Sequence, residues 1–192
     1  ILDELSSEKI YTVYDPFGGT GTTPLVVSKR GMQPFYSESN PFMLSVIEAK
    51  INRVKRLVDL GIGTEVLRKF INEFDKFTFQ LSLIPEDFGG FEKYFDNDIL
   101  AKVLHVKKAI SNVRDEDSRE LLMLALLSII VSVSKMIRRG DLRFATENEK
   151  KPGDSDVFGL FKSKVNNMIV DIESVGDQIR NFGTLLSSDA RD

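Results

Sequence analysis

The first hydrophobic stretch of the chain is followed by a glycine-rich loop and a short apolar segment. Residues 10–15 are rich in β-branched and aromatic side chains, which predicts a strand from Ile10 to Asp15. Three glycines follow within four positions, and Thr22 or Thr23 is suited to cap the next helix. That helix is predicted from Pro24 to Arg30, with Gly31 at its C′ position.

A second strand and a longer helix are predicted next. Gln33 to Glu38 has strand character, although Pro34 weakens its start. After Asn40-Pro41, apolar residues recur every three or four positions, and polar residues such as Asn52 fall on the other face. The apolar positions are Met43, Ile47, Ile51, Val54 and Val58, and Gly61 and Gly63 end the pattern. The order of strand, loop, helix, strand and helix is typical of the start of a doubly wound α/β sheet.

The pattern changes to helical periodicity after residue 60. We predict helices over 64–77, 96–113 and 115–139 and a last one that includes Phe161 and Ile179, with almost no strand between them. A loop with aromatic residues is expected over 81–95 and a polar loop over 145–156. Residues 183–189 return to strand character. The predicted organisation is an α/β part over 1–60, a helical insertion over 61–182 and a returning strand over 183–192.

Composition limits the classes of protein to consider. The 192 residues are 42% hydrophobic and 29% charged, as in a globular protein. With 26 basic and 29 acidic residues the net charge is −3, so nucleic-acid binding would require a local basic patch. The absence of cysteine excludes disulfides and thiolate metal sites and fits a cytoplasmic protein. The longest apolar run, Leu121–Val133, is shorter than the ~20 residues of a membrane span, and His105 alone does not indicate a metal site.

The glycine loop does not match the common phosphate-binding patterns. It lacks the Gly-Lys-Ser/Thr of a P-loop, and Pro24 stands where a dinucleotide motif has its third glycine. An acidic residue, Glu38, is predicted at the tip of the next strand, where a carboxylate can accept hydrogen bonds from ribose hydroxyls. These features indicate a site for an adenosine-containing ligand. The alternative is a tight turn without a ligand.

The loop sequence Asp-Pro-Phe-Gly-Gly-Thr-Gly-Thr at residues 15–22 resembles motif I of the S-adenosylmethionine-dependent DNA amino-methyltransferases. The segment Glu-Ser-Asn-Pro at 38–41 resembles the acidic motif II, and Ser-Asp-Ala-Arg at 188–191 resembles motif III. The resemblance covers about a third of the chain in the family's order. It implies an α/β fold, namely a partial Rossmann-like methyltransferase sheet with a large all-helical insertion, and S-adenosyl-L-methionine as the cofactor.

The resemblance also implies roles for individual residues. Asp15 would meet the amino-acid end of the cofactor, Phe17 would pack beside it, Glu38 would bind the ribose and Asp189 the adenine. Alternatively, Asp189 is only a solvated acid. The whole implied cofactor-binding set is Asp15, Pro16, Phe17, Gly18, Gly19, Thr20, Gly21, Thr22, Thr23, Glu38, Ser39, Asn40, Asp189 and Ala190.

The catalytic tetrapeptide of this family, in which an aromatic residue follows Pro-Pro, is absent from the sequence. We therefore assign no catalytic residue and expect the chain alone to be inactive, as a truncated enzyme or, less favoured, as half of a split one. The expected function is the cofactor-binding portion of a methyltransferase that modifies the exocyclic amine of adenine or cytosine in DNA. The alternatives are a non-catalytic DNA- or protein-binding subunit of a split methyltransferase or restriction-modification system, or another nucleotide-binding α/β protein.

Basic residues concentrate in the second half of the predicted insertion, at Arg138, Arg139, Arg143, Lys150 and Lys151. One interpretation is contact with the phosphates of double-stranded DNA. The other is a helix C-terminus whose macrodipole is complemented by cations. The sequence leaves both open. For the aromatic residues of 85–95, anchoring of a loop to the core is favoured over stacking on bases.

Overall fold

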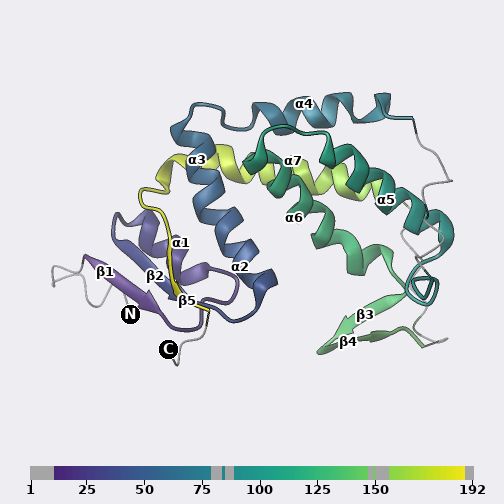
Figure 1. Cartoon of the computed structure of the whole chain (residues 1–192), viewed down its shortest axis with the longest axis horizontal. Coiled ribbons are helices and arrows are strands. Elements are labelled where there is room, and N and C mark those ends of the chain that lie inside the picture. The colour runs from purple at the N-terminus through teal and green to yellow at the C-terminus, as the bar shows by residue number, and fades with distance from the viewer. Residues whose placement is uncertain (1–10, 79–83, 85–88, 147–148, 150–155, 189–192) are drawn as a thin grey trace. The chain divides into compact units, whose positions relative to one another are not determined.

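The computed structural model describes residues 11–78, 84, 89–146, 149 and 156–188, and these residues belong to two compact units (Figure 1). The sheet unit comprises residues 1–64 and 170–192, and the helical unit comprises residues 65–169. The sequence placed the corresponding divisions after residues 60 and 182. Each unit has its own buried hydrophobic residues.

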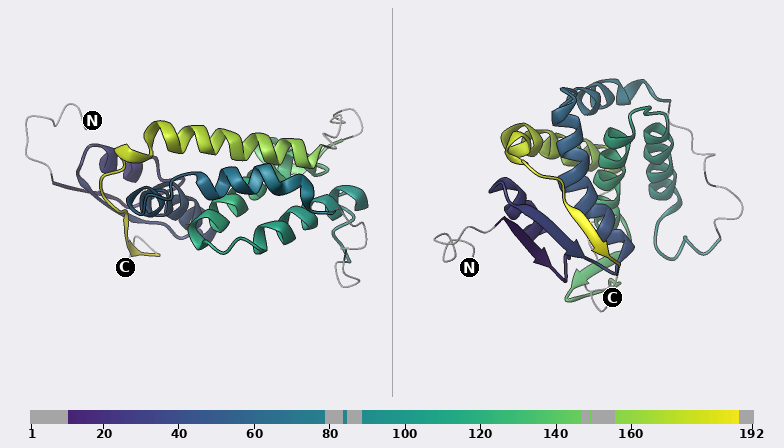
Figure 2. Two further views of the ribbon diagram at one scale, coloured as in Figure 1. Left: turned by 90° about the horizontal axis from the view of Figure 1, so that it is seen from above. Right: turned by 60° about the vertical axis from the view of Figure 1, so that its left-hand side comes forward.

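The sheet unit contains a small parallel sheet, as the sequence predicts. Its strands are β1 (Thr12–Asp15), β2 (Gln33–Ser37) and β5 (Thr184–Ser187), in the order β1-β2-β5. Both pairs are parallel, with Asp15 opposite Tyr36 and, after an irregularity, Ser37 opposite Ser187. The right-hand view of Figure 2 shows β5 running beside β2. All three strands therefore end at the same edge of the sheet.

Helix α1 (Thr22–Lys29) begins directly after the glycine loop. The N-cap is Gly21 in the left-handed conformation, so the prediction that Thr22 or Thr23 caps the helix was wrong. The chain turns at the glycine one residue earlier, and both threonines become the first two residues of the helix. The predicted end is confirmed, because Arg30 is the C-cap and Gly31 follows with a φ of 79°.

The second predicted helix is interrupted by a π-helical turn. It consists of α2 (Pro41–Glu48), the π-helical segment η1 (Ala49–Arg53) and α3 (Val54–Asp59). The Asn40 side chain caps α2 by accepting a hydrogen bond from the Phe42 N–H at 2.9 Å. Asn52, predicted on the polar face, is instead buried within η1, because the π turn changes which side chains face inward.

Two buried polar side chains bind the segment that leads into β5. Asn52 accepts a hydrogen bond from the Gly183 N–H at 2.7 Å and donates one to the Gly183 carbonyl at 3.0 Å. Ser28 of α1 donates to the Asn181 carbonyl at 2.6 Å and accepts from the Asn181 N–H at 3.0 Å. These bonds satisfy backbone groups that would otherwise be costly to bury, and they fix a segment distant in sequence beside β2.

The helical unit is built around aromatic and aliphatic side chains. Its helices are α4 (Glu65–Glu73), the 3₁₀ turn η2 (Phe74–Lys76), α5 (Asn97–Ser111), α6 (Glu116–Val133) and most of α7 (Val157–Val175). The 3₁₀ turn η5 (Gly176–Gln178) follows α7 and belongs to the sheet unit. In the core, the buried rings of Phe70 and Phe161 meet edge to face with centroids 6.2 Å apart. The predicted helices over 64–77 and 96–113 are confirmed within a few residues.

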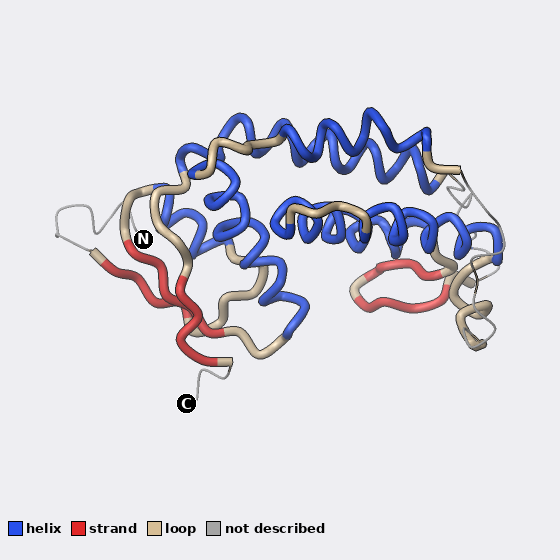
Figure 3. Tube along the Cα trace, turned by 45° about the horizontal axis from the view of Figure 1, so that its top comes forward, coloured by secondary structure: helices blue, strands red, loops and turns tan. Residues whose placement is uncertain are grey.

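The predicted helix over 115–139 is too long, because α6 ends at Val133 and a hairpin follows it. Strands β3 (Met136–Arg139) and β4 (Asp141–Phe144) pair antiparallel, and Figure 3 colours them red together with the three strands of the sheet. Ser134 leaves the helix in an extended conformation, and Gly140 turns the chain with a φ of 79°. The expectation of almost no strand in this stretch was therefore wrong.

Candidate functional site

The glycine loop joins the carboxyl end of β1 to α1 and is fixed by its own backbone. The Gly18 N–H donates to the Ser37 carbonyl at 2.8 Å, and the Gly21 N–H donates to the Gly18 carbonyl at 2.8 Å. The carboxylate of Asp15 accepts a hydrogen bond from the Phe17 N–H at 3.0 Å. The loop is thereby attached to the end of β2, at the edge of a parallel sheet where α/β proteins commonly bind ligands.

Each glycine of the loop has a distinct structural reason. At Gly18 a Cβ would lie 2.9 Å from Cδ1 of Ile47 and 3.3 Å from the Ser37 carbonyl oxygen, so space is lacking. Gly19 has a φ of 53° but open surroundings, so its requirement is conformational. Gly21 combines a φ of 79° with a Cβ position 3.0 Å from Cγ1 of Ile47. The glycines thus determine the conformation of the loop. The chemistry of a ligand would depend on the side chains around it.

Glu38 brings a negative charge directly to the loop. Its Oε2 accepts a hydrogen bond from the Gly19 N–H and its Oε1 accepts one from the Asn40 N–H, both at 2.8 Å. The N–H groups of Asn40, Gly19 and Ser39 lower the pKa of this carboxyl, so it is ionised at neutral pH. Each carboxylate oxygen keeps a further lone pair that can accept a hydroxyl hydrogen. The charge favours a ligand with hydroxyl or cationic groups and disfavours a phosphate at this position.

Phe17 presents an unusually open apolar surface at the same loop. Its side chain is 80% exposed, the highest value among the exposed large hydrophobic residues of the described chain. Pro16, Thr20, Thr22 and Thr23 are also exposed. A ring held out of the core by a rigid loop is available to pack against the apolar part of a bound molecule.

Other residues of the predicted set already have structural partners. The side-chain oxygen of Asn40 caps α2, and its N–H binds Glu38. One oxygen of Asp15 is bound to the Phe17 N–H, which shapes the turn. Glu38, Ser39 and Asn40 therefore form a fixed corner between β2 and α2, directly beside Gly19.

The sequence did not identify two residues that support the loop. Ile47 lies beneath Gly18 and Gly21, and Lys50 donates from Nζ to the Thr20 carbonyl at 2.8 Å. Helical periodicity indicates that Ile47 is buried, but not that it meets the loop. Lys50 had no signal, because it lies in the π-helical segment, where the helical period is broken.

The remaining predicted site residues lie either outside the described part of the chain or in the helical unit. Asp189 and Ala190 lie outside the described residues, as do Lys150 and Lys151. β5 ends at Ser187 and runs parallel to β2, so Ser187 lies at the same edge of the sheet as Ser37. Arg138, Arg139 and Arg143 lie on the hairpin of the helical unit. They are not at a helix C-terminus, so the macrodipole interpretation of these cations was wrong.

The described residues were also compared with the side-chain arrangements of metal sites and of reactive histidines. Among them, no three His, Cys, Asp or Glu side chains gather closely enough to hold a metal ion. His105 is buried, with its ring 6.1 Å from that of Phe74 and 5.7 Å from that of Phe158. Burial, with a smaller effect of Lys108, lowers the pKa of His105, so the ring is neutral at neutral pH. No helix in the described ranges has the length and apolarity of a transmembrane span.

Comparison of the chain with protein-family models, with curated proteins and with solved structures finds no match. The arrangement consists of a rigid glycine loop, an ionised carboxylate bound to it and an exposed aromatic ring, all at the carboxyl edge of a parallel sheet. Such an arrangement can bind the hydroxyls and the apolar surface of a small molecule.

Proposed function

We propose that the chain is the S-adenosylmethionine-binding portion of a DNA methyltransferase that modifies the exocyclic amine of adenine or cytosine. The observation that carries the proposal is the contact between Glu38 and the Gly19 N–H at 2.8 Å. It unites the segment that resembles motif I with the segment that resembles motif II at one edge of the sheet. The order β1-β2-β5 fits one half of a Rossmann-like methyltransferase sheet, with the helical unit inserted before β5.

The charge of the site favours this cofactor over nucleotides that carry phosphate. A phosphate-binding loop offers free N–H groups, whereas here the Gly19 N–H is occupied by a carboxylate. A phosphate at this position would also be repelled by ionised Glu38. S-adenosylmethionine has a ribose diol, an ammonium group and a sulfonium cation but no phosphate. Its ribose hydroxyls can donate to Glu38, and Phe17 can cover its apolar surface.

In the proposed reaction this chain positions one of the two reactants. When bound, S-adenosylmethionine would supply an activated methyl group: the amine nitrogen would bond to the methyl carbon as the carbon–sulfur bond breaks, the sulfur would keep the electron pair as a neutral thioether, and the amine would release one proton to water. Glu38 and the loop would orient the nucleoside, and Phe17 would exclude water from one side of it. Correct orientation of reactants is a large part of the rate enhancement in bimolecular transfer. None of the described residues is assigned to hold the target amine, so the chain by itself is expected to bind without turnover.

Isothermal titration calorimetry with S-adenosylmethionine and with NAD tests the proposal. We expect wild type to bind S-adenosylmethionine and not NAD. Phe17→Ala should weaken binding about tenfold or more, since covering a phenylalanine side chain contributes about 1.5–3 kcal/mol. Tyr11→Ala is the matched control, because Tyr11 is also an exposed aromatic residue of the sheet unit but precedes the opposite end of β1.

Three results would contradict the proposal. They are absence of S-adenosylmethionine binding, equal binding of NAD, and equal effects of the Phe17 and Tyr11 substitutions. Binding of DNA by a chain that does not bind S-adenosylmethionine would instead favour a non-catalytic DNA-binding subunit.

A further inference from the structure

The hairpin of β3 and β4 is a cationic surface within a protein of net negative charge. Residues 135–144 contain four basic side chains and one acidic side chain, whereas the whole chain has a net charge of −3. The basic residues are Lys135, Arg138, Arg139 and Arg143. The side chains of all four are substantially exposed. Lys135 precedes β3 and forms an ion pair with Asp96 at 2.8 Å, so the basic side chains of the two strands themselves are the three arginines.

The strand register divides these residues between the two faces of the ribbon. Ile137 lies opposite Arg143, and Ile137 is buried, so one face rests on the protein at that point. Arg138 lies opposite Leu142 on the other face, and Leu142 is 51% exposed. Within the described ranges, Arg138 has no acidic partner. The outer face therefore combines a cation with an exposed apolar side chain.

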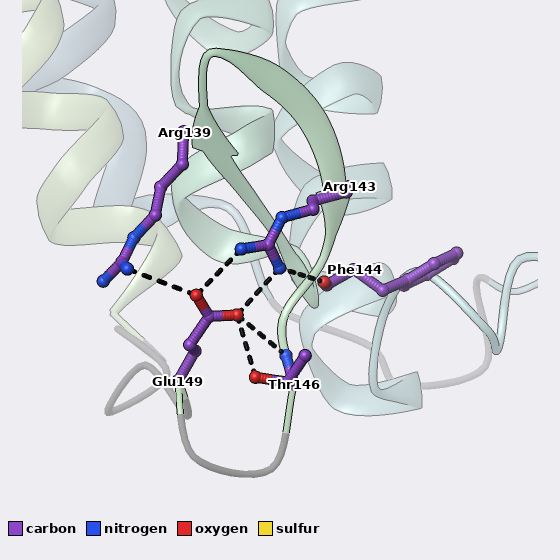
Figure 4. Close-up of polar contacts among 5 residues, drawn as sticks. All are labelled: Arg139, Arg143, Phe144, Thr146 and Glu149. Carbon is purple, nitrogen blue, oxygen red and sulfur yellow. Dashed lines mark hydrogen bonds and ion pairs between the residues drawn. The ribbon is translucent and has the colours of Figure 1, made fainter.

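Glu149 occupies an anion-binding arrangement at the same hairpin (Figure 4). Arg143 donates from both terminal nitrogens to the two carboxylate oxygens, at 2.7 and 2.8 Å. Arg139 forms an ion pair with Oε1 at 3.2 Å, and the Thr146 hydroxyl donates to Oε2 at 2.9 Å. The hydrogen bonds from Arg143 and then from Thr146 lower the pKa of Glu149 to about 2, so the carboxylate is charged at neutral pH.

The geometry around Glu149 is one that a phosphate group can also use. A planar guanidinium binds carboxylate or phosphate through two parallel hydrogen bonds, and a second cation and a hydroxyl complete the coordination. Arg139 is 69% exposed, so its guanidinium can be reached from solvent while it is paired. Glu149 is therefore placed where a phosphate oxygen pair from a ligand would bind.

An aromatic residue outside the hairpin, Tyr94, contacts the base of the hairpin. Tyr94 stacks on Phe144 of β4, with ring centroids 5.3 Å apart and planes 20° apart. The Tyr94 carbonyl accepts a hydrogen bond from the Lys135 N–H at 2.7 Å, and Phe95 is buried. The burial of Phe95 agrees with the predicted anchoring of this loop to the core, whereas Tyr94 contacts the hairpin and Phe91 is 44% exposed. The ribbon is held at its base while its turn at Gly140 is exposed.

We propose that the β3–β4 hairpin contacts double-stranded DNA, with Arg138 on one phosphate and Arg139 and Arg143 on another that replaces Glu149. A two-stranded β-ribbon fits the major groove of B-DNA, where an apolar side chain such as Leu142 can also meet thymine methyl groups. Arginine is the residue best suited to bidentate phosphate contacts. The inference rests on the proposed function for its choice of DNA as the partner.

Fluorescence anisotropy of a labelled DNA duplex with the full chain, in the absence of cofactor, tests the hairpin. Arg138→Gln should weaken binding and reduce the dependence of log K on log salt by about one phosphate contact. Glu149→Gln should strengthen binding several-fold, because it removes the competing charge. Arg114→Gln is the matched control, because Arg114 is an exposed arginine of the same unit between α5 and α6. It should leave both affinity and salt dependence unchanged.

Each part of the hairpin proposal has a result that would overturn it. Equal weakening by Arg138→Gln and Arg114→Gln would show a general charge effect and overturn the role of the hairpin. Unchanged or weaker binding by Glu149→Gln, with an unchanged circular dichroism spectrum, would overturn the exchange of carboxylate for phosphate. Tighter binding to anionic phosphatidylserine vesicles than to DNA would overturn the choice of partner. Because the DNA titration contains no cofactor, a defective cofactor site leaves these results interpretable, and a failure here leaves the cofactor proposal intact.

Discussion

The glycine loop and the β3–β4 hairpin both turn at a glycine with a φ of 79°, but their surroundings differ. A Cβ at Gly21 would press against Ile47 in the core of the sheet unit, whereas a Cβ at Gly140 would meet nothing within 4 Å. The loop is fixed to β2 by a hydrogen bond between backbone groups. At the hairpin, by contrast, the exposed side chain of Arg143 pairs with the side chain of Glu149. The loop is thus suited to hold one ligand rigidly, and the hairpin to exchange one anion for another.

The largest expected effect on stability, in either unit, comes from removing a buried isoleucine side chain. Ile47→Ala and Ile169→Ala each delete a fully buried side chain, Ile47 in the sheet unit and Ile169 in the helical unit. Each should lower the free energy of unfolding by about 2–5 kcal/mol in urea denaturation. Only Ile47→Ala should also weaken S-adenosylmethionine binding, since Ile47 supports the loop. Equal loss of binding in both variants would contradict a local role of Ile47.

Replacing the two turn glycines tests the same contrast through the difference between the two positions, which should be about 1–3 kcal/mol. Gly140→Ala should cost about 1–2 kcal/mol, because a residue with a Cβ is strained in the left-handed conformation. Gly21→Ala carries the same strain and adds about 1–3 kcal/mol of overpacking against Ile47. Urea denaturation followed by circular dichroism measures both. Equal costs at the two positions would show that Ile47 yields to the added methyl group.

The acid dependence of stability tests the bonds of Glu38 and of Glu149 through a still smaller effect. Both have a pKa lower than the ordinary 4.5, so each stabilises the folded chain above that pH and loses its contribution as the pH falls through its folded pKa. For Glu149 the loss should extend to about pH 2, and solvent screening should keep it small. Glu149→Gln should reduce the decrease of the urea midpoint between pH 5 and pH 2, and Glu38→Gln should reduce that decrease below pH 4.5. If Glu38→Gln leaves the decrease of the urea midpoint at acid pH unchanged, the bonds of Glu38 to Gly19 and Asn40 do not stabilise the fold.

The sequence predicted the sheet unit well because each signal there is local. Strand composition, glycine content and helical periodicity each specify a few neighbouring residues, and β1, β2 and α1 follow from them. The bonds from Asn52 to Gly183 were not predicted, because they join residues 131 positions apart. The π turn at η1 was not predicted either, because the apolar spacing of this segment is that of a continuous α-helix. Sequence periodicity alone contains no information about such a pairing.

The hairpin was missed for a different reason. The apolar run of α6 continues to Val133, and the residues after it could extend the helix by composition alone. One signal of the hairpin was present in the sequence. Gly140, which permits a tight turn, stands between two short segments that each mix polar and apolar residues. The pairing of Arg139 and Arg143 with Glu149 was also invisible, since it requires the hairpin to bring them together.

A ¹H–¹⁵N NMR titration of the full chain with S-adenosylmethionine tests the cofactor site residue by residue. We expect shifts of the backbone amides of Phe17 to Gly21 and Glu38 to Asn40, with the Gly140 amide of the hairpin unmoved. NAD at the same concentration should leave all of these amides in place. Unmoved loop amides at saturating S-adenosylmethionine, or equal shifts with NAD, would contradict the assignment of this loop as the cofactor site.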